Sequence, residues 1–428
     1  MFKKKETLVT AFALFSLFFG AGNLILPPLL GFNSGDQWLI VTIGFGLSAV
    51  AIPVLGILAH AKLQGTLIDF GNKVSPTFSL IYAFFIYAIA IALPSPRTAS
   101  VTHEIAIQPY WDISSWFTSS IYFALVLLFA LNRSKILNIL GKVLTPAIIL
   151  ILLLVIGITV FRFPFGFGST IIESPFTNGI LEGYQTFDAI GAVVVGGVII
   201  ISINLKYVNA SYEDKKLLIR NAAWFAGLAL FLIYMGLILS GSLVHSIFDA
   251  DTTRTEILSG LAIQSLGNIG NLFLSILVGL ACFTTAVGIV TGTADFVASR
   301  FKESKSAYTI MAIIGSVLGV LVGQFNVAYI IAVAIPSLMF IYPITIILIV
   351  LNVVPDKYAS SLVFRAVTIA TILFSIPDFL GSIGTLTPES NTFSWIPLQQ
   401  YSLGWVLPAL AMFVLSNIYI NYNKNYLS

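Results

Sequence analysis

The residues most able to do chemistry lie inside the first long apolar run, between Leu8 and Leu30. Its middle reads Phe-Phe-Gly-Ala-Gly-Asn at residues 18–23, and Pro27 and Pro28 follow about one turn later. Glycine weakens a helix interior, and proline removes a backbone donor. In hydrocarbon, each freed backbone group is costly unless protein, water or a ligand satisfies it. The stretch therefore predicts a helix broken at mid-membrane around a bound solute or ion, and close helix packing by small residues is the alternative.

The two halves of such a broken helix would offer different ligands. An outer half that begins near Gly22 points its free amides to mid-membrane, where they favour an anion such as a small carboxylate. An inner half that ends near Phe19 leaves carbonyls that can coordinate a cation. A second group of oxygens stands at Ala281, Thr284 and Thr285, where two hydroxyls follow a carbonyl by one turn. Neutral oxygens suit a small hard cation, and the alternative is that both threonines bond back to their own helix.

Two charged residues also fall within apolar runs. Asp188 lies in a glycine-containing run, and a buried acid there could titrate, pair with a ligand amine or cap a broken helix. The alternative is that Asp188 lies close enough to the outer surface to be exposed to water. Arg97 follows two prolines, and it is expected either to pair with Glu104 or gate an outer vestibule, or to snorkel from a helix end.

Composition sets the class of protein in which these residues act. The 428 residues are 58% hydrophobic and only 9% charged, with a mean hydropathy of +0.98. Soluble domains carry about 25% charged residues, so the chain is expected to be an all-α polytopic membrane protein. The single cysteine, Cys282, excludes a disulfide framework within the chain, and the three histidines show no metal-site spacing. Walker A, hydrolase and channel-filter motifs are absent, which argues against a direct ATP drive, an enzyme and a channel.

Twelve membrane spans are expected, in a single membrane domain that covers residues 1–428. Their approximate limits are 7–31, 38–59, 77–101, 116–131, 139–161, 183–205, 221–243, 269–298, 307–323, 325–351, 363–382 and 400–421. With a cytoplasmic amino terminus, all but three of the 21 lysines and arginines fall in inner segments, the exceptions being Arg97, Arg162 and Arg254. This bias predicts that both termini are cytoplasmic.

The first and sixth spans start from opposite sides and both carry glycine in mid-span, which favours a five-plus-five inverted repeat. Repeat 1 would cover about residues 7–161 and repeat 2 about 183–351. The last two spans, at about 363–421, fall outside the repeat.

Four motifs together resemble one family of carriers. They are residues 15–28 of the first span, Pro-Arg-Thr-Ala at 96–99, the run 182–192 with its Tyr184 and Asp188, and Phe-Thr-Thr at 283–285. These stretches are similar to the branched-chain amino acid:cation symporters, the LIVCS or BrnQ family of bacterial carriers. The resemblance extends over essentially the whole chain.

The resemblance implies uptake of leucine, isoleucine and valine by symport with Na⁺ or H⁺ across the bacterial plasma membrane. It implies the LeuT-like fold of the amino acid–polyamine–cation superfamily, with no cofactor, no nucleic acid and no ATPase subunit. It also implies a sodium site made by the carbonyls of Ser16, Phe19 and Ala281 and the hydroxyls of Thr284 and Thr285.

The same resemblance suggests how the substrate is held, and leaves other solutes open. The substrate-binding residues are expected to be Phe18, Gly20, Ala21, Gly22, Asn23, Tyr184, Phe187, Asp188 and Ile190. Amides near Ala21 to Asn23 would take the carboxylate, carbonyls from Phe187 to Ile190 with Asp188 would take the amine, and the aromatic rings would line an apolar pocket. Arg97 and Asp188 are candidates for gating or coupling. The alternatives are another small zwitterion or nucleobase on the same fold, or an ion channel.

Overall fold

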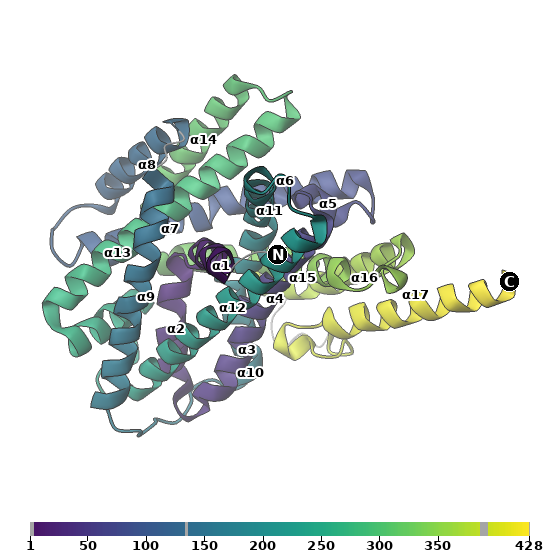
Figure 1. Ribbon diagram of the computed structural model, residues 1–428. Coiled ribbons are helices and arrows are strands. Elements are labelled where there is room, and N and C mark those ends of the chain that lie inside the picture. The colour runs from purple at the N-terminus through teal and green to yellow at the C-terminus, as the bar shows by residue number, and fades with distance from the viewer. Residues whose placement is uncertain (1–3, 133–135, 386–392, 428) are drawn as a thin grey trace. The chain divides into compact units, whose positions relative to one another are not determined.

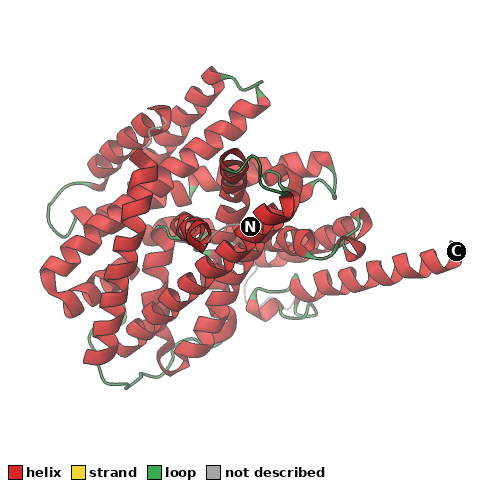
Figure 2. Ribbon diagram, viewed as in Figure 1, coloured by secondary structure: helices red, strands yellow, loops and turns green. Residues whose placement is uncertain are grey.

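A computed structural model describes residues 4–132, 136–385 and 393–427, and every regular element in those ranges is helical (Figure 2). The α-helices are α1 (Lys4–Phe18), α2 (Ala21–Ser34), α3 (Trp38–Gly46), α4 (Ile52–Leu63), α5 (Leu67–Gly71), α6 (Pro76–Ala92), α7 (Pro94–Thr102), α8 (Ser115–Asn132), α9 (Ile136–Arg162), α10 (Pro175–Tyr184), α11 (Asp188–Lys206), α12 (Tyr212–Leu243), α13 (Arg254–Arg300), α14 (Lys305–Gly323), α15 (Val327–Val353), α16 (Ser361–Ser382) and α17 (Val406–Leu427).

Ten helical segments in the described part of the chain are long and apolar enough to cross a membrane. The chain is therefore an all-helical polytopic membrane protein. The first and sixth of the twelve expected spans do not stand among the ten as separate helices. Each of these two is divided into two shorter helices, α1 with α2 and α10 with α11.

The first break confirms the expected interruption of the opening span. Helix α1 ends at Phe18 and α2 begins at Ala21, one residue before the expected Gly22. Between them, Gly20 is extended, with φ −110° and ψ −168°. The amide of Gly20 donates to the carbonyl of Phe18 at 2.9 Å, not to that of Ser16 four residues back as in a continuous helix.

The second break lies at residues 185–187, and it begins from a helix that the sequence did not predict. Helix α10 starts at Pro175, whereas the sixth span was expected to start at Gly183, because polar residues within 175–184 hide this helix from a hydropathy reading. Phe187 closes the break in the left-handed region, at φ 64°. Such a conformation is strained for a bulky residue, so contacts from elsewhere must hold it.

The chain divides into two compact units. The first unit consists of residues 1–50, 87–188 and 221–332, and the second of residues 51–86, 189–220 and 333–428. In the first unit, α13 runs beside α9 and α14 and also packs against α2 and α7 (Figure 1). Helix α13 bends at Gly267, whose φ is 71°, so residues from 268 onward form the expected eighth span.

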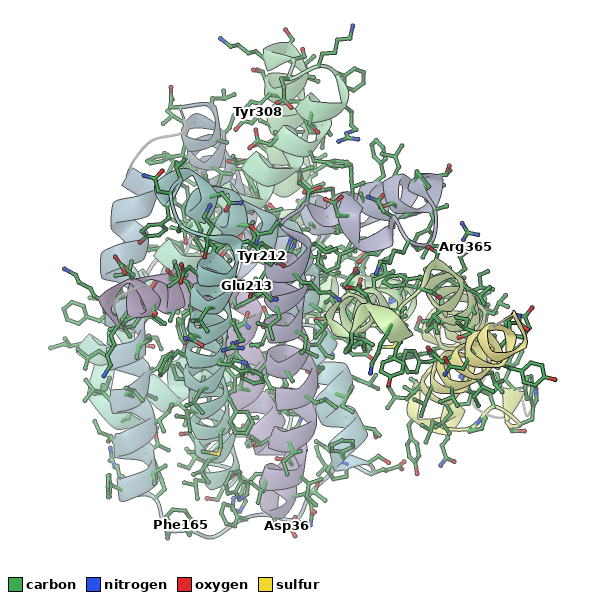
Figure 3. The ribbon with its side chains drawn as sticks, turned by 45° about the vertical axis from the view of Figure 1, so that its right-hand side comes forward. Asp36, Phe165, Tyr212, Glu213, Tyr308 and Arg365 are labelled. Carbon is green, nitrogen blue, oxygen red and sulfur yellow. The ribbon has the colours of Figure 1, made fainter. Side chains whose placement is uncertain are left out.

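Side chains at the two ends of the first unit agree with the expected alternation of sides. Asp36 and Phe165, from connections that were both expected outside, lie at the same end (Figure 3). Tyr308, which follows an expected inner connection, lies at the opposite end.

Glycines bring two pairs of helices in the first unit into backbone contact. A β-carbon on Gly31 of α2 would lie 1.8 Å from the carbonyl oxygen of Ile238 in α12. Reciprocally, a β-carbon on Gly241 of α12 would lie 1.9 Å from the carbonyl oxygen of Pro28. Helix α3 packs in the same way against α10, through Gly44 and Gly179. Helix α2, the second half of the first span, is thus packed closely against α12.

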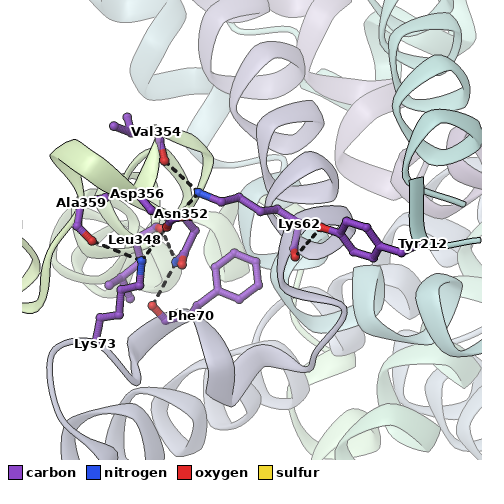
Figure 4. A network of polar contacts seen from close by, with 9 residues as sticks. All are labelled: Lys62, Phe70, Lys73, Tyr212, Leu348, Asn352, Val354, Asp356 and Ala359. Atoms are coloured by element: carbon purple, nitrogen blue, oxygen red, sulfur yellow. Dashed lines mark hydrogen bonds and ion pairs between the residues drawn. The ribbon is translucent and has the colours of Figure 1, made fainter. Parts of the chain in front are cut away.

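In the second unit, a polar cluster joins the ends of several helices (Figure 4). Lys62 and Lys73 both pair with Asp356, at 3.2 and 3.0 Å from its Oδ1 atom. Asn352 donates to the carbonyl of Phe70 at 3.0 Å. This cluster ties the connection after α4 to the one after α15.

Candidate functional site

A buried amide at the start of α2 joins residues from three separate segments of the first unit. Nδ2 of Asn23 donates to Oδ2 of Asp188 at 2.5 Å and to the hydroxyl of Tyr234 in α12. Oδ1 of Asn23 accepts from the amide of Gly20 at 3.3 Å. The side chain of Asn23 therefore closes the first break and binds the acid at the second break.

Asp188 is the first residue of α11 and is only 5% exposed, which excludes the alternative that it is wet. Its own amide donates to the hydroxyl of Thr186 at 3.2 Å. Because Asp188 to Ile190 belong to the first turn of α11, the open part of the break consists of residues 185–187. The expected stretch of exposed carbonyls, Phe187 to Ile190, therefore overlaps the observed break only at Phe187.

Arg97 corrects two expectations. It is only 3% exposed in α7, so it neither snorkels nor belongs to an outer segment. Nη1 of Arg97 donates to the carbonyl of Gln185 at 2.6 Å, and the guanidinium carbon lies 5.1 Å from the centre of the Phe187 ring. Glu104, the expected partner, instead accepts from the hydroxyl of Thr255 at 2.7 Å and the amide of Val327 at 2.8 Å. Arg97 thus holds the second break.

The same guanidinium reaches the first break. A β-carbon placed on Gly22 would lie 2.5 Å from Nη2 of Arg97, closer than real side chains approach. Glycine at position 22 is thus what allows a buried cation to lie against the first turn of α2. Arg97 and Asn23 therefore each contact both breaks.

A small cavity lies beside the first break, in the region expected to bind a cation. It is lined by Phe15, Ser16, Phe19, Thr145, Ile148, Ala281 and Thr284. Four of these residues, Ser16, Phe19, Ala281 and Thr284, are among the five expected sodium ligands. The carbonyl of Ser16 does not receive the amide of Gly20, which suits it to another partner.

The two threonines make the back-bonds that were the alternative expectation. The hydroxyls of Thr284 and Thr285 donate to the carbonyl of Ala281 at 2.9 and 3.0 Å. A hydroxyl that donates one hydrogen bond keeps its lone pairs, so back-bonding and cation binding are compatible. Thr285 also lies beside the break, since its Oγ1 is 3.5 Å from the position of a β-carbon on Gly20.

The remaining expected substrate residues are buried. Phe18, Ala21, Tyr184 and Phe187 are buried in the first unit, and Ile190 is buried in the second. Among the described residues, no group of three or more histidine, cysteine or acidic side chains could hold a metal ion. The site therefore consists of neutral oxygens and amides together with the buried guanidinium of Arg97 and the buried carboxyl group of Asp188.

Sequence reasoning missed Tyr234 and the carbonyl of Gln185. Tyr234 carried a signal, because a hydroxyl inside an otherwise apolar span needs a polar partner. Gln185 carried no such signal, because Arg97 donates to its backbone carbonyl and not to its side chain.

Known proteins are similar to this chain over nearly its full length. The family model described as branched-chain amino acid transport protein matches residues 3–423. The branched-chain amino acid permease BrnQ of Corynebacterium glutamicum is 33% identical over 427 residues, which cover 98% of this chain and 96% of the relative. The permease BraB of Bacillus subtilis is 32% identical over 419 residues, covering 95% of this chain and 93% of the relative.

Two solved structures share the fold at low sequence identity. Mhp1 in its inward-facing conformation matches with a TM-score of 0.60 and 12% identity, over 97% of this chain and 91% of that one. MhsT in complex with L-phenylalanine matches with a TM-score of 0.57 and 14% identity, over 96% of this chain and 97% of that one. These similarities show a LeuT-like fold.

Proposed function

This chain belongs to the branched-chain amino acid transport protein family, and from that premise we propose that it imports leucine, isoleucine and valine by symport with Na⁺ or H⁺. It is a branched-chain amino acid permease and not an enzyme. The observation that carries the coupled mechanism is the break at Phe19 and Gly20 with a small cavity beside it.

The cation binds between the first and eighth spans. Its ligands are the carbonyls of Ser16, Phe19 and Ala281 and the hydroxyls of Thr284 and Thr285, a set of neutral oxygens that suits a small hard cation. Because Ser16 and Phe19 belong to the inner side of the break, a bound cation would fix α1 relative to α13. Release of the cation would free α1 to move.

The amino acid binds at the two breaks. The first-turn amides of α2, from Ala21 to Asn23, face its carboxylate, and Asp188 with the adjoining backbone faces its amine. Phe18, Tyr184 and Phe187, all of the first unit, supply apolar surface for the branched side chain. An aliphatic pocket separates substrates that differ by one methylene by only about 1–3 kcal/mol, so leucine, isoleucine and valine compete with one another.

The membrane arrangement is part of the proposal. The chain crosses the bacterial plasma membrane twelve times with both termini in the cytoplasm, and its first ten spans form two inverted repeats of five. Support comes from the divided first and sixth spans, which occupy matching places in the two halves, and from the distribution of basic residues. Transport follows by alternating access around the two breaks.

Counterflow of labelled leucine into proteoliposomes tests the proposal. Vesicles preloaded with unlabelled leucine, isoleucine or valine should accumulate label transiently, and imposed Na⁺ and H⁺ gradients should identify the coupling ion. A channel would give ion flux without saturable counterflow. Absence of counterflow with all three amino acids, from protein that is monodisperse and reconstituted, would contradict the proposed substrate.

A further inference from the structure

We propose that the guanidinium of Arg97 binds the substrate carboxylate and thereby selects amino acids over amines with the same side chain. The inference deepens the proposed function and rests on it. It assigns the main anion-binding group to a side chain of the third span, together with the amides of the first.

The position of Arg97 carries this assignment. Nη2 lies against Gly22, so it stands beside the first-turn amides of α2, where the helix end already favours an anion. Nη1 is fixed by the carbonyl of Gln185 at 2.6 Å, and the guanidinium plane rests near the Phe187 ring. A guanidinium held at one nitrogen and over a ring is oriented in advance for a carboxylate at the other nitrogen.

The charges around the breaks fit a zwitterion. The carboxyl group of Asp188 is buried, and Nδ2 of Asn23 donates to it at 2.5 Å. A buried guanidinium and a buried carboxyl group therefore both lie near the start of α2. A ligand with a carboxylate and an ammonium group would complement both of them, whereas a simple amine would complement only Asp188.

A purely structural role is the competing explanation. Arg97 could serve only to hold the second break, since it contacts the carbonyl of Gln185 and the ring of Phe187. In that case its loss would weaken every ligand of the site to the same extent. The two explanations differ in whether the effect depends on the carboxylate of the ligand.

The test compares leucine with leucinamide, which keeps the ammonium and the side chain but lacks the carboxylate. Apparent dissociation constants would be obtained from ligand-dependent thermal stabilisation of the purified full-length protein, for the wild type, Arg97→Gln and Arg97→Lys. Arg254→Gln is the matched control, because Arg254 pairs with Glu182 of α10 at 3.1 Å and donates to the side chain of Gln185 at 3.4 Å. It thus supports the second break without being assigned to the carboxylate.

The wild type should bind leucine about 100-fold more tightly than leucinamide, as expected when one partner of a buried charge pair is removed. Arg97→Gln should lower that ratio at least tenfold by weakening leucine alone, and the amides of α2 account for the preference that remains. Arg97→Lys should give an intermediate ratio, because lysine keeps the positive charge but lacks the paired N–H donors of the planar guanidinium. Arg254→Gln should leave the ratio unchanged.

Three results would overturn the assignment. These are an unchanged ratio in Arg97→Gln, equal weakening of both ligands by that change, and, if Arg97→Gln is not monodisperse, a wild-type ratio in Arg97→Lys. Failure of the wild type to bind leucine would count against the proposed function instead, so the two failures are distinguishable.

Discussion

The two interrupted spans are broken by different means. The first break is built from a glycine in an extended conformation, and a side chain three residues away, Asn23, accepts from its amide. The second break has Phe187 in the left-handed region, and Arg97 from another span holds the preceding carbonyl. The first break is thus specified within one short segment, whereas the second depends on tertiary contacts.

This difference indicates which of the two breaks is more sensitive to changes in the contacts around it. A left-handed conformation at a residue that is not glycine costs on the order of 1–3 kcal/mol, so the second break persists only while its contacts do. The first break costs less, because the extended conformation of Gly20 is unstrained for any residue. Changes to Arg97 or its neighbours should therefore disturb the second break more than the first.

The largest effect on uptake is expected from Gly22→Ala, because the added methyl would clash with Arg97, which contacts both breaks. The added methyl would lie 2.5 Å from Nη2 of Arg97, and the guanidinium would have to leave its position. Initial leucine uptake in proteoliposomes should fall by about 100-fold, comparable to loss of a buried charge contact.

Gly157→Ala is the matched control, since a β-carbon on Gly157 of α9 meets nothing within 4 Å. That variant should transport like the wild type. Normal uptake by Gly22→Ala would show that the guanidinium can move without loss of function. It would contradict the proposal that Arg97 connects the two breaks.

The double change Thr284→Ala with Thr285→Ala isolates the first break. Removal of both hydroxyls should abolish stimulation of leucine uptake by Na⁺, because the remaining carbonyls no longer complete the coordination shell. Uptake would be measured with and without a sodium gradient.

Thr293→Ala controls for the loss of a back-bonded threonine in the same helix, because its hydroxyl donates to the carbonyl of Ile289 at 2.8 Å. Sodium stimulation should survive in this control. Undiminished stimulation in the double variant would remove Thr284 and Thr285 from the ion site.

Asp188→Asn tests the acid at the second break with a smaller expected effect. The new amide oxygen can still accept from Asn23, so the fold should be retained while the negative charge is lost. Leucine affinity should fall about tenfold, the size of one charge-assisted hydrogen bond. The dependence of uptake on pH should also flatten if the carboxylate titrates during transport. An unaltered affinity together with an unaltered pH profile would argue against both roles.

The smallest effect is expected in the second unit, at Asp356, which provides a baseline for polar contacts that are open to solvent. Hydrogen bonds from Lys73 and then from Lys62 hold the pKa of Asp356 below its usual value of 3.8. The ion pairs therefore contribute stability above about that pH and lose it as the pH falls through the lowered pKa.

Because the side chain of Asp356 is 69% exposed, Asp356→Asn should cost less than about 1 kcal/mol. The difference in thermal stability between the variant and the wild type should be constant from pH 5 to pH 8. A difference that changes across this interval would show that another group titrates with the cluster.

Sequence reasoning reached the first break because residue type alone encodes it, through glycine and asparagine in an apolar run. It reached the neighbouring threonines through their spacing after Ala281. It misplaced the start of the sixth span at Gly183, because the ten residues of α10 are too polar to stand out by hydropathy. It also misjudged Arg97, since a sequence shows that an arginine follows two prolines but not that a glycine in another span leaves room for it.

The reciprocal glycine contacts between α2 and α12 decide which part of the first span can act as a lever. With backbone carbonyls seated where β-carbons of Gly31 and Gly241 would be, any sliding of α2 along α12 meets immediate steric resistance. The fifteen-residue α1 contains no glycine and so cannot make a contact of this kind, and the chain leaves the helix between Phe18 and Ala21. We therefore expect α1 to change position during transport while α2 stays packed against α12.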